Sequence, residues 1–114
     1  MSAAGLKERL RADLKAAMQA RAGDDVRLLR TLIAALDNAE AVPRDPSHDN
    51  LPRAFGDPSA EVAGRKLDGG ALETLLQTEI DARLSAAKEY DRLHQDAEAA
   101  RLRTEAELIE RYRA

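Results

Sequence analysis

Two histidines are the side chains in this chain best suited to bind a metal ion or to move protons near neutral pH. His48 lies among prolines, and His94 follows a long helical pattern. Neither has a second ligand at a spacing typical of a metal site, and the chain contains no cysteine. We therefore predict no metal site, no cofactor and no cysteine nucleophile, and we interpret His94 as a helix-terminal residue favoured by the helix dipole.

Carboxylates in the second half of the chain could in principle pair for metal binding or acid–base catalysis. The acids considered are Glu73, Glu79, Asp81, Glu89, Asp91, Glu98, Glu105, Glu107 and Glu110. Their helical spacing beside arginines is typical of a solvated helix face. Gly69-Gly70 lacks the lysine and the Ser or Thr of a phosphate-binding loop, and no hydroxyl lies in a nucleophile elbow. We predict no catalytic residue.

Tyr90 and Tyr112 are the tyrosines of a chain with only 3% aromatic residues. Stacking on nucleic-acid bases usually needs several aromatics in a basic groove. We expect instead that each ring lies at the edge of a core while its hydroxyl group reaches a polar partner.

Composition limits the remaining functions. The 114 residues carry a formal net charge of -3 with both signs interspersed, so the chain presents no strong overall field to DNA or to an anionic membrane. No apolar run approaches the roughly 20 residues that span a bilayer, and the first residues lack the apolar stretch of a signal peptide. We expect a cytoplasmic protein with no membrane and no DNA partner.

Two helices are predicted in the first third of the chain, over about 3–21 and 24–41. The apolar stripe of the first recurs at every fourth position, through Leu6, Leu10, Leu14 and Met18, with Lys7, Arg11 and Lys15 on another face. The stripe of the second is Val26, Leu29, Leu32 or Ile33, and Leu36. Gly23 suits the position just past a helix end, and either Asp24 or Asp25 could cap the next helix. So short a connection predicts an antiparallel hairpin.

A linker is predicted over 42–70, where the periodicity is lost. All four prolines lie there, at Pro43, Pro46, Pro52 and Pro58. Neither a helix nor a regular strand tolerates this spacing well. Phe55, the only phenylalanine, either packs on the helices or stays in solvent, and the sequence favours neither alternative.

A second hairpin is predicted from helices over about 71–94 and 96–113. The apolar stripes are Leu72, Leu76, Ile80, Leu84 and Ala87 in the first and Leu102, Ala106 and Ile109 in the second. Asp96 is the predicted N-cap. The break at 94–96 contains no glycine or proline, so one helix over 71–113 that pairs with a second copy is the alternative. The predicted fold is all-α, a four-helix arrangement of two helical hairpins in one domain, 1–114.

Five segments resemble the GatB/YqeY family. They are DNAEA at 37–41, EVAGRKL at 61–67, EIDAR at 79–83, AAKEYDRL at 86–93 and AARLRTE at 99–105. The resemblance covers essentially the whole chain and is greatest to the short YqeY-like proteins with a proline-containing insert. Similar proteins often have Leu-Gly where this chain has Leu93-His94. They also continue beyond a position like Tyr112, through Leu-Pro, into a smaller C-terminal helical domain, so we expect this chain to lack that domain.

The resemblance implies kinship with the helical region of the tRNA-dependent amidotransferase B subunit, and so with carbon–nitrogen ligation that uses glutamine as amido donor. That chemistry resides in other domains of those enzymes. We therefore expect a non-catalytic module that binds a translation-related protein or tRNA, with Arg65, Lys66, Arg83 and Arg92 as candidate partner-binding residues. The alternatives are a stand-alone amidotransferase-related enzyme and a structural helical oligomer.

Overall fold

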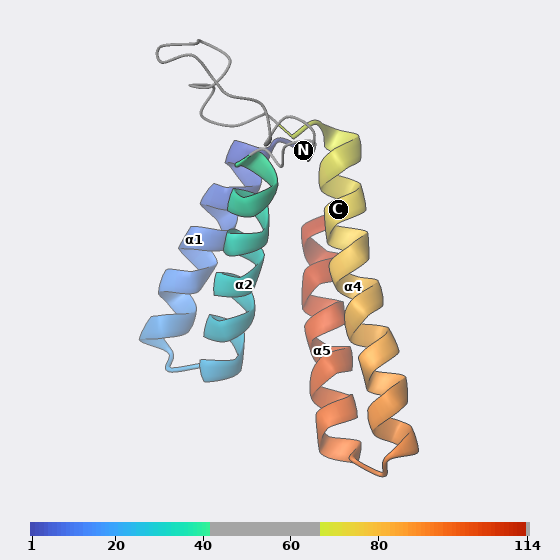
Figure 1. Cartoon of the computed structure of the whole chain (residues 1–114). Helices are drawn as coiled ribbons and strands as arrows, with labels where there is room; N and C mark the ends of the chain where they lie inside the picture. Colours follow the sequence, from blue (N-terminus) through green and yellow to red (C-terminus); the bar gives the residue numbers. More distant parts are fainter. Residues whose placement is uncertain (42–66, 114) are drawn as a thin grey trace, which may run out of the picture.

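The computed structural model describes residues 1–41 and 67–113, which form four helices and no strand. The helices are α1 (Ala3–Gln19), α2 (Gly23–Glu40), α4 (Gly69–Arg92) and α5 (Asp96–Arg113). Figure 1 shows α1 and α2 as one antiparallel hairpin and α4 and α5 as a second, longer one beside it. The predicted all-α fold of two helical hairpins is confirmed, and each described helix end lies within two residues of its predicted position.

The turn between α1 and α2 differs from the prediction. Arg21, not Gly23, adopts the left-handed conformation, with φ of 57°, and the amide of Ala22 donates to the carbonyl of Ala17. Gly23 is already the first residue of α2, and Ala22 precedes it without a side-chain cap. Asp24 and Asp25 lie in the first turn, where their charges favour the positive end of the helix dipole.

The turn between α4 and α5 excludes one continuous helix over 71–113. His94 adopts a left-handed conformation with φ of 58°, and the amide of Gln95 donates to the carbonyl of Tyr90 at 2.8 Å. This pattern closes the last turn of α4. Asp96, the predicted N-cap, is the first residue of α5 and adds its charge to the first turn.

Replacing His94 with glycine is expected to stabilise the protein by about 0.5–1 kcal/mol. A left-handed conformation costs an ordinary side chain roughly 1–2 kcal/mol, and the larger chain entropy of unfolded glycine offsets part of this gain. Urea unfolding followed by far-UV circular dichroism measures the change. Gln95→Gly is the matched control and should not stabilise; equal effects of the two changes would contradict the assigned strain.

The start of α4 lies earlier than predicted. Asp68 accepts a hydrogen bond from the amide of Ala71 at 2.7 Å, so the helix begins at Gly69 and takes in Gly69 and Gly70, the last two residues of the predicted linker 42–70. Leu67, just before this cap, is buried. His48 and Phe55 lie outside the described residues.

The main core draws buried side chains from all four helices. They include Leu6, Leu10, Leu28, Leu29, Leu32, Leu36, Leu72, Leu76, Ile80, Ala106, Ile109 and Tyr112. Two predicted core positions are wrong. Met18 is 50% exposed and Ala17 is buried in its place, and Leu84 is 40% exposed. Each step of four residues turns about 40° further round an α-helix, so a strict four-residue stripe leaves the core face after three steps.

A smaller, separate core lies close to the α4–α5 turn. It consists of Ala87, Ala99 and Leu102, with Ala86 and Tyr90 packed against it. This end of the second hairpin extends beyond the first hairpin (Figure 1). None of the helices within the described ranges combines the length and the apolar character that crossing a membrane requires.

Candidate functional site

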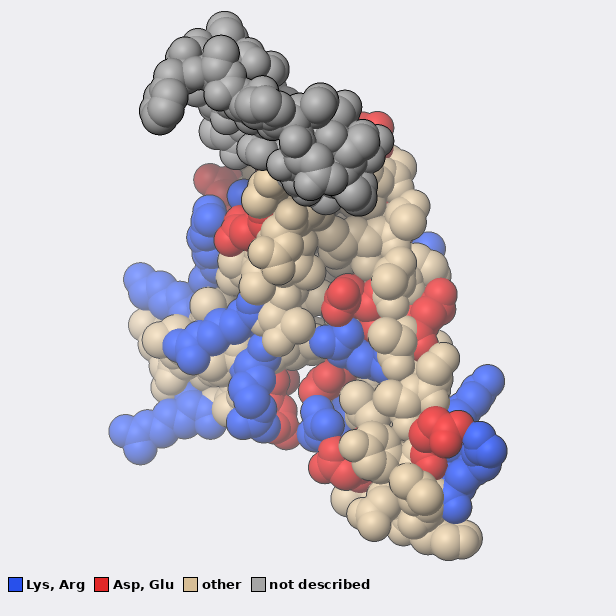
Figure 2. Space-filling view, in the orientation of Figure 1, with Lys and Arg blue, Asp and Glu red and all other residues tan. Residues whose placement is uncertain are grey.

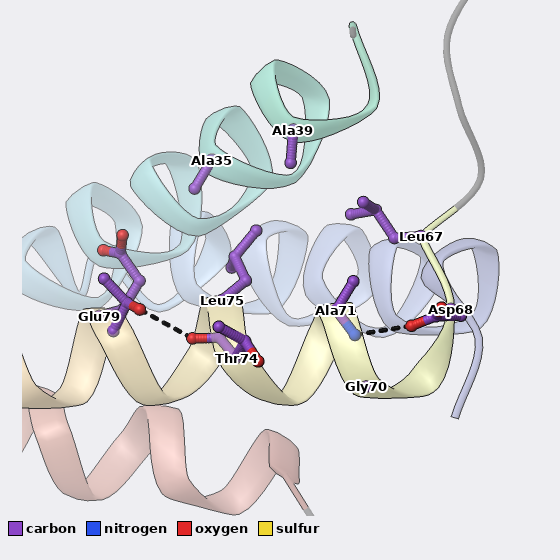
Figure 3. Close-up of a pocket in the computed structure, with 10 residues that line it drawn as sticks. Ala35, Ala39, Leu67, Asp68, Gly70, Ala71, Thr74, Leu75 and Glu79 are labelled. Carbon is purple, nitrogen blue, oxygen red and sulfur yellow. Dashed lines mark hydrogen bonds between the residues drawn. The ribbon is translucent and has the colours of Figure 1, made fainter. Parts of the chain in front are cut away.

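A groove of about 640 Å³ lies between α2 and α4 (Figure 3). Its lining residues are Ala35, Ala39, Leu67, Asp68, Gly70, Ala71, Thr74, Leu75, Thr78 and Glu79. The side chain of Leu75 points from α4 toward α2 and forms part of the wall. The groove can receive apolar groups, because half of its ten lining residues are alanine or leucine.

Three of the four polar side chains that line this groove already have partners in the fold. Asp68 caps α4, and the hydroxyl of Thr78 donates to the carbonyl of Thr74 at 2.9 Å. The Glu79 carboxylate accepts from Arg83 at 2.9 Å. A carboxylate held in an ion pair or a helix cap stabilises structure, so neither acid of the groove has the environment of a general acid or base.

A second surface lies on the outer side of the first hairpin. Arg11, Lys15 and Met18 follow one another at helical spacings of four and three on the exposed side of α1. Lys7, one turn before Arg11, pairs with Asp37 and Glu40 of α2, which fixes the edge where the two helices meet. Arg30 lies about two turns before Asp37, on the α2 side of that edge. We call Arg11, Lys15, Met18 and Arg30 the basic face.

The three cations of the basic face are exposed and have no acidic partner among residues 1–41 and 67–113. Figure 2 shows Lys and Arg side chains gathered over the α1–α2 hairpin. Residues 1–41 carry seven Lys or Arg and six Asp or Glu, whereas residues 67–113 carry seven and eleven. The first hairpin is therefore slightly positive and the second strongly negative.

Arg83, a predicted partner-binding residue, lies in an ion-pair network between α4 and α5. Its guanidinium donates to Glu79 at 2.9 Å and to Glu105 at 3.1 Å, and its side chain is only 13% exposed. Glu105 also accepts from Arg101 at 2.6 Å. These bonds join the two helices, so Arg83 has a structural role in the fold whatever else it binds.

Arg92, by contrast, is 72% exposed beside Glu89 at the end of α4. Nine residues separate it from Arg83, which places the two on opposite sides of the helix, about 13 Å apart along its axis. The structure does not bring them into one patch. Arg65 and Lys66 lie outside the described residues, so the four-residue patch stays a prediction.

Tyr112 joins the two hairpins. Its ring is buried, its hydroxyl group donates to the Asp13 carboxylate of α1, and the Arg9 guanidinium lies 5.0 Å from the ring centre. Burial first, and then the hydrogen bond to Asp13, raises the pKa of Tyr112 above its ordinary value of about 10. The predicted position at the core edge, with a polar partner, is confirmed for this tyrosine. Tyr90 is half-buried against the smaller core.

Replacing Tyr112 with phenylalanine is expected to destabilise the protein by about 1–2 kcal/mol at neutral pH, because the Asp13 carboxylate loses its donor. The raised pKa also means that the folded state holds the phenolic proton more tightly than the unfolded state does. The stability that the raised pKa contributes to the folded state is complete below pH 10. It is lost as the pH rises through the folded-state pKa.

Urea unfolding of both proteins at pH 7 and at alkaline pH measures this effect. The stability difference between wild type and Tyr112→Phe should shrink above pH 10, whereas Tyr90→Phe should show a smaller difference at pH 7. A Tyr112→Phe difference that stays constant across this range would contradict the assigned cause.

No group of three or more potential metal ligands occurs among the described residues. The sequence prediction missed Arg30, and it assigned no role in binding to Arg11 and Lys15, although it placed both on one face. The sequence did contain a signal for these residues. Residues 1–41 carry more basic than acidic residues, whereas residues 67–113 carry more acidic than basic ones. Comparison with models of protein families, with curated proteins and with solved structures gave no match.

Proposed function

We propose that this chain is a non-catalytic helical module, related to the helical region of the tRNA-dependent amidotransferase B subunit, that binds a translation-related protein or tRNA. The five segments that resemble the GatB/YqeY family support the kinship. The observation that carries the binding function is the basic face, where three exposed cations lack acidic partners among the described residues.

The surroundings of the ionisable groups support a role in binding rather than in catalysis. The hydrogen bonds that Lys7 donates, first to Glu40 and then to Asp37, raise the pKa of Lys7, and the Arg103 guanidinium lowers the pKa of Asp91. Both pairs connect neighbouring helices of one hairpin. Like the raised pKa of Tyr112, these two shifts have structural causes.

The basic face has the properties of a recognition surface. Arg11 and Lys15 project from a helix whose opposite side is buried in the main core, so their backbone positions are fixed before a partner arrives. Arg and Lys side chains of this kind steer negatively charged partners and contribute to specificity. Carbon–nitrogen ligation would then belong to other domains of the related enzymes.

Affinity capture with the tagged full chain tests the proposal. Crosslinked proteins and RNA from the native lysate are identified by mass spectrometry and sequencing. We expect translation proteins or tRNA to be enriched with the wild type and to be reduced at least several-fold with Arg11→Glu/Lys15→Glu. Lys88→Glu/Arg111→Glu on the second hairpin makes the same change in net charge and serves as the control. Failure to recover either class of molecule with the wild type would refute the proposed function.

A further inference from the structure

The basic face forms a short ridge with a defined spacing. Arg11, Lys15 and Met18 occupy relative positions 0, 4 and 7 of α1, so neighbouring members are about 6 Å apart on one side of the helix. Arg30 adds a cation from the adjacent helix. The exposed carboxylate of Glu8, three residues before Arg11, ends the positive region on that side. The ridge therefore spans about two turns of helix.

The charge distribution favours a short anionic partner over a long polyanion. The cations are few, and residues 67–113 carry four more acids than bases. A nucleic-acid duplex extends beyond this small face and would be repelled by the acidic second hairpin. A short acidic segment that binds only to the basic face interacts mainly with charges within the screening length of about 8 Å.

Met18 supplies a second indication of the partner. Its thioether side chain is 50% exposed at the end of the cationic ridge. A phosphate backbone offers no apolar group for such a side chain, whereas an amphipathic helix offers one beside its charged residues. Methionine also adapts its shape readily to different apolar partners.

We infer that the basic face binds an acidic amphipathic helix of another protein. This inference rests on the proposed function and assigns its partner to the protein class. Acidic residues four positions apart on the partner pair with Arg11 and Lys15, an apolar residue one turn beyond contacts Met18, and Arg30 pairs with a further acid on the flank.

Fluorescence anisotropy with three probes tests the inference on the full chain. The first probe is a labelled synthetic helical peptide with glutamates at positions 0 and 4 and leucine at position 7 of one face. The others are a labelled RNA hairpin of equal net charge and phosphatidylserine vesicles. We expect Arg11→Glu/Lys15→Glu to weaken peptide binding by about 10-fold or more, since each lost charge pair is replaced by repulsion. Met18→Gln should weaken it about 2- to 5-fold.

The controls separate this inference from the proposed function. Lys88→Glu/Arg111→Glu should change peptide affinity less than 2-fold at equal ionic strength, and circular dichroism confirms that each variant is folded. Tighter binding of RNA or vesicles than of peptide, insensitive to Met18→Gln, would overturn the inference. RNA binding would still agree with the proposed function, in which tRNA is one of the two alternative partners. Absence of peptide binding would overturn the inference alone, because the capture experiment tests the proposed function independently.

Discussion

Replacing Leu10 with alanine is expected to lower the free energy of unfolding by about 2–5 kcal/mol. The Leu10 side chain is fully buried in the main core, where side chains from both hairpins meet. Truncation removes apolar contacts and leaves a cavity that the packed helices fill only in part. Urea unfolding followed by far-UV circular dichroism measures the loss.

Met18→Ala is the matched control for this change. Met18 lies two helical turns beyond Leu10 on the stripe expected from the sequence, yet it is half-exposed. Its truncation should cost about 0.5 kcal/mol or less. If the two substitutions cost the same, the orientation of α1 against the core would be wrong.

Replacing Arg83 with alanine is expected to destabilise the protein by about 2–3 kcal/mol. The change leaves the carboxylates of Glu79 and Glu105 close together without their shared cation, and the Glu105 side chain is only 14% exposed. Removing one partner of a largely buried ion pair leaves the other charge uncompensated, which costs more than the pair contributes.

Arg92→Ala provides the comparison, because this arginine also pairs with a glutamate on α4 but is 72% exposed. Exposed pairs contribute about 0.2–1 kcal/mol to stability. The midpoint temperature of thermal unfolding of this variant should therefore be close to that of the wild type. A larger loss with Arg92→Ala than with Arg83→Ala would reject the structural role of Arg83. Binding experiments with Arg83 variants therefore need a stability measurement alongside.

The helices could be predicted from the sequence because their signal is local. Leu72, Leu76 and Ile80 repeat at the helical period, and a connection of a few residues between two such patterns leaves an antiparallel hairpin as the simple solution. The left-handed residues Arg21 and His94 carry no such signal. Glycine marks this conformation in most sequences, and here the closing of each hairpin imposes it on other side chains.

The charged surface was harder to predict because ion pairs depend on packing between elements. The pairing of Arg83 with Glu105 joins positions 22 residues apart and follows from the register of α4 against α5. In the same way, the position of Arg30 beside α1 follows from the pairing of Lys7 with Asp37. The sequence places each residue on a helix face, but only the packed hairpins decide which faces meet.

The separate small core near the α4–α5 turn implies two levels of hydrogen-exchange protection. Three buried residues hold that end of the hairpin, whereas the main core involves all four helices. Local opening needs less free energy where fewer apolar contacts are lost. Backbone amides around Ala87 and Ala99 should therefore exchange with deuterium well before those around Leu76 and Ile109, whose exchange is limited by global unfolding.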